Sequence, residues 1–144
     1  MNESEVSELV EDFNNTIADK DLNRFLGFFD DSCEIELMNL KLKGKKGAEK
    51  WFKWMYSYCE NVRFDYITTA FKDANFFVEY ALKADMKGGD SIESKQTVVL
   101  LFEDKLVKSL RLYFDRLDFA LAVANLPSRI IINQIIKKSV EGLT

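Results

Sequence analysis

The sequence predicts an α+β domain in which helices lie on one face of a curved, mostly antiparallel sheet. Three observations lead to this fold class. Up to residue 59, apolar residues recur with helical spacing except over residues 33–42. The run from 62 to 114 alternates as strands do, and helical spacing returns after Asp115. Short breaks within the strand-like run indicate a meander of antiparallel strands.

The elements before the meander are predicted from apolar spacing and one capping residue. Residues 5–18 carry apolar side chains three and four positions apart, which is typical of an amphipathic helix. Asp21 is a suitable N-cap for a short second helix through Phe29. Residues 33–42 then alternate with a period of two and indicate a strand or hairpin, and residues 48–59 return to helical spacing.

Turn residues divide the rest of the chain. The pair Gly88-Gly89 is a hairpin turn signal. After the meander, Asp115 can cap a helix, and Pro127 fits the first turn of a final one. We expect one domain over 1–126 and a helical extension over 127–144 that packs on the domain or on a partner subunit. The predicted strands span residues 62–71, 75–86, 92–103 and 105–114.

Composition excludes several classes of site. The chain has 144 residues, of which 47% are hydrophobic and 12 are Phe, so a single domain can bury a substantial core. It contains no His, which removes imidazole bases and His-ligated metals. Cys33 and Cys59 are too far apart for a metal motif and are expected to be reduced thiols. We therefore expect no metal and no cofactor.

Charge and hydropathy bear on the location of the protein and on its partners. The net charge of −4 argues against nucleic acid as a partner. The first residues do not resemble a signal peptide, and no apolar run approaches the ~20 residues that cross a bilayer. These features predict a cytoplasmic protein without a membrane partner. The lysines between residues 41 and 53 are interpreted as a solvated surface.

The order of elements and three short motifs resemble those of the nuclear transport factor 2-like superfamily, and within it the SnoaL-like group. The motifs are Phe-Phe-Asp-Asp at 28–31, Gly47 at the start of the third helix, and Leu-Tyr-Phe-Asp at 112–115. The resemblance covers about residues 5–125. It implies a cone, in which a strongly curved sheet wraps on the N-terminal helices and encloses a pocket. Such domains often pair through the sheet.

Two enzyme relatives within this superfamily can be compared position by position. Limonene epoxide hydrolases carry a catalytic Asp where this chain has Leu112, and an Arg-x-Asp pair where it has Tyr80 and Leu82. None of the three groups that activate water in those enzymes is retained. The resemblance therefore does not extend to epoxide hydrolysis by that mechanism.

Ketosteroid isomerases give a similar result. Their oxyanion-hole Tyr and Asp align with Phe13 and Val98, neither of which can donate a hydrogen bond. Only the general-base position keeps a carboxylate, at Glu36. Because Ile35 and Leu37 flank it and prefer burial, the strand pattern favours a solvent-facing Glu36, whereas the alignment turns it inward.

Strand alternation predicts which residues lie on each face of the sheet. The outer face of the last two strands carries Val99, Leu101 and Tyr113, which makes a homodimer through this face plausible. The inner face would be mostly apolar, with Tyr80 and Gln96 as polar exceptions. The predicted pocket residues are Phe13, Met55, Phe76, Val78, Tyr80, Leu82, Gln96, Val98, Leu110, Leu112 and Phe114.

Three functions are compatible with this pattern. The favoured hypothesis is a domain that binds a small hydrophobic molecule in the cone. The first alternative is an isomerase, cyclase or hydratase that uses Glu36 as acid or base with Tyr80 or Gln96. The second is a protein-interaction scaffold that uses the sheet face or the C-terminal helix. If large side chains fill the cone, the scaffold is favoured.

Overall fold

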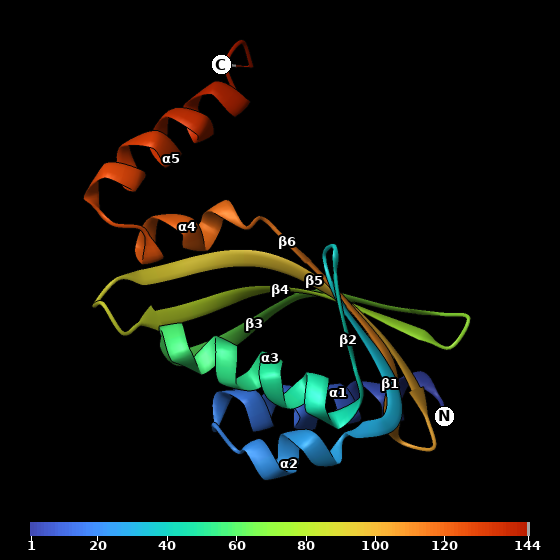
Figure 1. The fold of residues 1–144 in the computed structure, drawn as a ribbon. Helices are drawn as coiled ribbons and strands as arrows, with labels where there is room; N and C mark the ends of the chain where they lie inside the picture. Colours follow the sequence, from blue (N-terminus) through green and yellow to red (C-terminus); the bar gives the residue numbers. More distant parts are fainter. Residues whose placement is uncertain (144) are drawn as a thin grey trace.

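A six-stranded sheet curves over three N-terminal helices in the computed structural model, which describes residues 1–143 (Figure 1). The strands are ordered β2-β1-β6-β5-β4-β3. All neighbours are antiparallel except β1 and β6, which run parallel, so the predicted α+β class and mostly antiparallel sheet are confirmed. The elements are α1 (Glu3–Ala18), α2 (Leu22–Gly27), β1 (Phe29–Leu37), β2 (Leu40–Lys43), α3 (Gly44–Tyr58), β3 (Cys59–Lys72), β4 (Asn75–Met86), β5 (Ser91–Glu103), β6 (Leu106–Phe114), α4 (Leu117–Val123) and α5 (Leu126–Ser139).

Helices α1 and α2 begin at capping residues. Asn2 and Glu5 form a reciprocal capping box at the start of α1, and the Asp21 side chain accepts a hydrogen bond from the Arg24 amide at the start of α2. The predicted second helix is two residues too long, because Phe29 already pairs with Val107 of β6. The first strand therefore starts four residues earlier than the alternation indicated.

A glycine fixes the corner between β2 and α3. The third helix begins at Gly44, four residues before its predicted start at 48. Gly44 has a φ of +66°, and a Cβ at this position would lie 2.9 Å from the carbonyl oxygen of Asp31. Only glycine fits this backbone without strain. The periodic signal missed this turn of helix because its residues are glycine and lysine.

Ladder irregularities bend the sheet. The register shifts between Phe29 and Glu34 in β1, and again between Tyr66 and Thr68 in β3. Extra residues of this kind kink a strand and increase its twist. The strands therefore curl around the helices and leave a concave inner face and a convex outer one.

The predicted inner face is confirmed along the central strands. Alternate residues of β4 and β5, from Phe76 to Ala84 and from Gln96 to Phe102, are all buried. On the outer face of β5, Val99 is also buried, while Leu101 is half-buried. Tyr113 of β6 is 47% exposed on the same outer face. The homodimer through this face stays a prediction.

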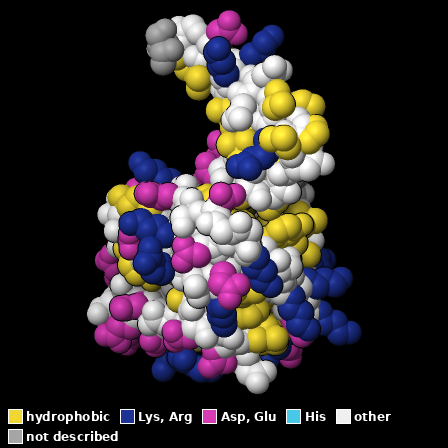
Figure 2. All heavy atoms as spheres, turned by 90° about the vertical axis from the view of Figure 1, so that its left-hand side faces the viewer, with side chains coloured by type: hydrophobic (Ala, Val, Ile, Leu, Met, Phe, Trp, Pro, Cys, Tyr) yellow, Lys and Arg dark blue, Asp and Glu magenta, His cyan; other side chains and the backbone are white. Residues whose placement is uncertain are grey.

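The last helix extends away from the sheet (Figure 1). It begins at an Asn125 cap with Pro127 in its first turn, it contacts α4, and it has no buried residue. Apolar side chains gather on the face of α5 seen in Figure 2, and Ile130, Ile131 and Ile135 are among those exposed. The packing of residues 127–144 on a partner subunit stays a prediction. No helix within residues 1–143 is long and apolar enough to span a membrane.

Candidate functional site

A cavity of about 380 Å³ lies between the concave face of the sheet and helices α1, α3 and α4. Its walls are mainly apolar. Trp54 and Tyr58 on α3 are about half exposed and mark its mouth. The lining residues are Phe13, Asn14, Ile17, Met38, Trp51, Trp54, Met55, Tyr58, Cys59, Phe64, Tyr80, Leu82, Met86, Gln96, Val98, Leu112, Phe114, Arg116, Phe119, Ala120 and Val123.

Aromatic packing closes the inner end of this cavity. Phe13 and Trp51 line it, and both rings also contact Phe25, at centroid distances of 5.5 and 5.8 Å. Phe25 is completely buried and also packs on Phe29 and Phe52. The cavity therefore rests on a solid aromatic cluster and opens toward the opposite end of the sheet.

A chain of hydrogen bonds crosses the inner wall. The Tyr80 hydroxyl donates to Gln96 Oε1 at 3.0 Å, and Gln96 Nε2 donates to Ser94 Oγ at 3.4 Å. Ser94 Oγ donates in turn to Asp118 Oδ2 of α4 at 2.7 Å. Burial raises the pKa of the Tyr80 hydroxyl well above its ordinary value, so it is a neutral donor at physiological pH. These polar groups therefore serve as hydrogen-bond partners for one another.

Burial disfavours the thiolate form of the cysteine at the cavity wall. Cys59 is buried, and its Sγ lies 3.7 Å from Met86 Sδ. Burial raises the pKa of the Cys59 thiol above its ordinary value of 9.0. Since the thiolate is the nucleophilic form, this cysteine contributes apolar surface rather than chemistry.

Most of the predicted pocket residues lie together. The structure brings Phe13, Met55, Tyr80, Leu82, Gln96, Val98, Leu112 and Phe114 to the cavity wall. Phe76, Val78 and Leu110 also face inward, but they do not line the cavity. They lie farther along the same strands, where they belong to the buried core together with residues of the N-terminal helices.

Glu36 does not lie in the cavity. Its neighbours Ile35 and Leu37 are buried in the core, so the alternation of β1 turns Glu36 to the other face, where it is half-buried. The position taken from the family alignment is therefore not an inward one. Burying the two flanking apolar side chains is favourable, whereas burying the Glu36 carboxylate without a partner would be costly. The acid or base role proposed for Glu36 therefore has no support from this geometry.

Two helical stripes complete the site, and of their residues only Met55 was among the predicted pocket residues. Trp51, Trp54, Met55 and Tyr58 recur three and four positions apart on α3. The same spacing places Arg116, Phe119, Ala120 and Val123 on one side of α4. This periodicity is visible in the sequence, but nothing in it shows that α4 returns over the open end of the sheet.

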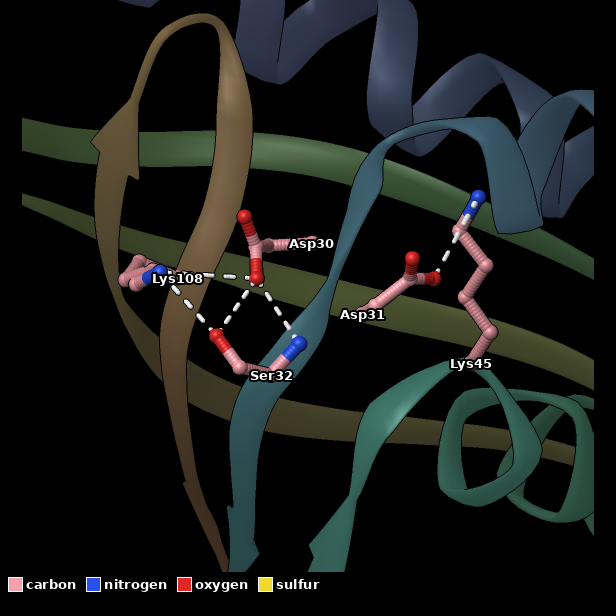
Figure 3. Close-up of polar contacts among 5 residues, drawn as sticks. All are labelled: Asp30, Asp31, Ser32, Lys45 and Lys108. Atoms are coloured by element: carbon pink, nitrogen blue, oxygen red, sulfur yellow. Dashed lines mark hydrogen bonds and ion pairs between the residues drawn. The ribbon is translucent and has the colours of Figure 1, made fainter.

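A separate polar cluster lies on β1 and β6, outside the cavity (Figure 3). Asp30 Oδ1 accepts hydrogen bonds from Ser32 Oγ at 2.6 Å and from the Ser32 amide at 2.7 Å. Lys108 Nζ lies 3.0 Å from Ser32 Oγ and 3.4 Å from Asp30 Oδ1. The Ser32 hydrogen bonds, followed by Lys108, lower the pKa of Asp30 below its ordinary value.

This cluster is structural. It spans the point where the β1–β6 register shifts, and an ion pair of 3.9 Å between Asp31 and Lys45 joins the same segment to α3. Ser32 is exposed and already donates to a carboxylate. The three side chains therefore hold an irregular strand in place.

Comparison with known proteins gives structural matches only. No model of a protein family matches the sequence, and the search of curated proteins found no match. A nuclear transport factor 2-like protein of unknown function from Burkholderia pseudomallei K96243 superposes with a TM-score of 0.74 at 13% identity, over 82% of this chain and 97% of that one. A hypothetical protein from Catenulispora acidiphila with a ketosteroid isomerase-like fold, in complex with trimethylamine, gives 0.72 at 13% identity, over 80% and 91% of the chains.

A third similar structure is an enzyme. SalBIII, an epoxide hydrolase/cyclase-like enzyme of pyran ring formation in the polyether salinomycin, gives a TM-score of 0.72 at 13% identity, over 81% of this chain and 95% of that one. The fold of this chain is thus shared with a hypothetical protein, a protein of unknown function and an enzyme. This chain has the fold of the nuclear transport factor 2-like superfamily.

Proposed function

We propose that this protein binds one small hydrophobic molecule in the cavity between the sheet and helices α1, α3 and α4. The observation that carries the proposal is an apolar cavity of about 380 Å³ with an aromatic mouth. Ligand sites in proteins begin at about 300 Å³ and are lined mainly by apolar side chains with a few polar groups. The size of this cavity suits a small ligand.

The polar groups of the cavity favour binding over catalysis. Tyr80 and Gln96 are bonded to each other, and the chain of hydrogen bonds ends at Asp118. No residue of the wall that the structure describes offers an ionised carboxylate or an imidazole to a substrate. The positions of the epoxide hydrolase and isomerase groups hold Leu112, Phe13 and Val98, which supply surface but no proton transfer.

Binding can be measured with N-phenyl-1-naphthylamine, a neutral apolar fluorophore. Trp51 and Trp54 are the two tryptophans of the chain, and both line the cavity. We expect saturable binding at a single site, with a rise in probe emission and a fall in tryptophan emission as energy is transferred. Binding that is not saturable would contradict the proposal.

A filled cavity is the sharpest control. Val98 points into the cavity from the middle of β5, so Val98→Phe should occupy the space and reduce probe binding at least tenfold. Thr97→Phe adds a similar ring one residue away, on the opposite face of the strand, and should bind the probe as the unmodified protein does. Equal binding by both variants would show that the probe binds elsewhere.

A further inference from the structure

One charged side chain lines the cavity. Among the lining residues, which all fall within the described range 1–143, Arg116 alone carries a charge. It lies at the start of α4, and its exposure places the guanidinium at the rim rather than in the interior. The rim therefore combines a cation with the aromatic rings of Trp54 and Tyr58.

Neighbouring carboxylates do not form an ion pair with this cation. Asp115 Oδ1 accepts a hydrogen bond from the Leu117 amide at 2.9 Å, and Asp118 accepts one from Ser94. Over residues 1–143, no carboxylate oxygen lies within 4.0 Å of the Arg116 guanidinium. The two acids close to Arg116 in the sequence thus accept hydrogen bonds from other groups, and the five N–H donors of Arg116 form no ion pair within residues 1–143.

We propose that the ligand is an amphipathic carboxylate, such as a medium-chain aliphatic acid, whose apolar chain fills the cavity while its carboxylate binds Arg116 at the rim. This inference rests on the proposed binding function and specifies the ligand class. A guanidinium matches a carboxylate with two parallel hydrogen bonds, a geometry that an alcohol or an ammonium group does not provide.

The arrangement also explains why the charge lies at the rim. A carboxylate inside the apolar interior would lose its hydration without a charged partner, which is costly. At the rim it keeps part of its hydration and gains Arg116, while the methylene groups leave water. The bonded pair Tyr80 and Gln96 leaves the interior without a competing charge.

A ligand series of constant chain length isolates the headgroup. Decanoate, 1-decanol and decyltrimethylammonium would compete for bound N-phenyl-1-naphthylamine at neutral pH, where the acid is ionised. We expect decanoate to bind roughly three- to fivefold more tightly than decanol, the effect of a partly exposed ion pair, and the ammonium to bind most weakly. The preference for decanoate should shrink as salt is added.

Variants assign the preference to one residue. Arg116→Gln should remove the advantage of decanoate over decanol and leave decanol unchanged, and Arg116→Lys should restore part of it. Arg129→Gln removes the same charge from the exposed surface of α5, outside the cavity, and should leave all three affinities unchanged.

The outcomes separate the two proposals. If the fluorophore binds but decanoate and decanol compete equally, the ligand class is wrong and the apolar site stands. The inference is also overturned if Arg116→Gln weakens decanol as much as decanoate, because the residue then only shapes the rim. If the fluorophore itself does not bind, both proposals fail.

Discussion

The two ends of the concave face are built from the same strands and differ in what covers them. At one end, Phe76 and Val78 of β4 pack against the N-terminal helices, and the aromatic cluster around Phe25 is completely buried. At the other end, Tyr80 and Leu82 of the same strand border a cavity. A single alternating pattern therefore produces a packed core and an open site.

The difference lies in the covering helices. Helices α1 and α2 supply three phenylalanines to the packed end, namely Phe13, Phe25 and the adjoining Phe28. Over the open end lies α4, which is seven residues long and has no buried residue. An open site in this fold thus results from a cover that is too short and too small to fill the space beneath it.

Truncating a phenylalanine at each end should produce the largest contrast. Phe25→Ala removes a ring that contacts four other aromatic residues, and we expect a loss of about 3–5 kcal/mol in the free energy of unfolding. Phe114→Ala removes a half-buried ring that borders the cavity, with an expected loss of about 1–2 kcal/mol. Urea unfolding measures both, and equal losses would show that the two ends are equally packed.

A smaller effect is expected at Tyr80. Tyr80→Phe leaves Gln96 Oε1 without its donor and should cost about 1 kcal/mol near neutral pH. The pKa of Tyr80 is raised in the folded state above its ordinary value of 10.0, so its contribution is complete below that pH and is lost as the pH rises through the folded-state value.

The difference in the free energy of unfolding between the unmodified protein and Tyr80→Phe should therefore narrow above about pH 10. Burial also raises the pKa of Tyr56, to about 12. Since Tyr56 is present in both proteins, its titration changes the stability of both equally. Tyr113→Phe, on the outer face, is the matched control and should leave the stability unchanged. A gap that stays constant up to pH 11 would show that Tyr80 does not titrate differently in the folded and unfolded chains.

The smallest effect concerns α5. Deleting residues 126–144 should change the free energy of unfolding of the remaining chain by less than about 0.5 kcal/mol, because α5 has no buried residue. Thermal unfolding of the two chains tests this. Light scattering of the same samples shows whether α5 or the sheet face carries any self-association. A large loss of stability at a constant oligomeric state would mean that α5 packs on the domain.

Much of the fold could be predicted because its signals are local. The alternation of β4 and β5 fixed which residues face inward, and the Gly88-Gly89 turn marked the hairpin that joins these strands. The helix ends were less accurate. Phe29 fits a helical stripe as well as a strand, and only its pairing with Val107 decides between the two.

The part of the site that depends on strand alternation could be predicted, because that signal is also local. Strand parity placed Tyr80, Gln96 and Val98 at the wall, but it could not show how far the helices reach along the sheet. Phe76 and Leu110 have the same parity and lie under the helices instead. Arg116 was not predicted, because a charged residue just after a strand is common. Its place at the cavity follows only from the way the next helix folds back over the sheet.

Helix α4 has a consequence for how occupancy could be observed. It forms one wall of the cavity, none of its residues is fully buried, and Ser94 donates a hydrogen bond of 2.7 Å to Asp118. A bound molecule would act as the missing core beneath this helix. Local opening of α4 would then require release of the ligand, so amide hydrogen exchange in α4 should slow in proportion to ligand occupancy.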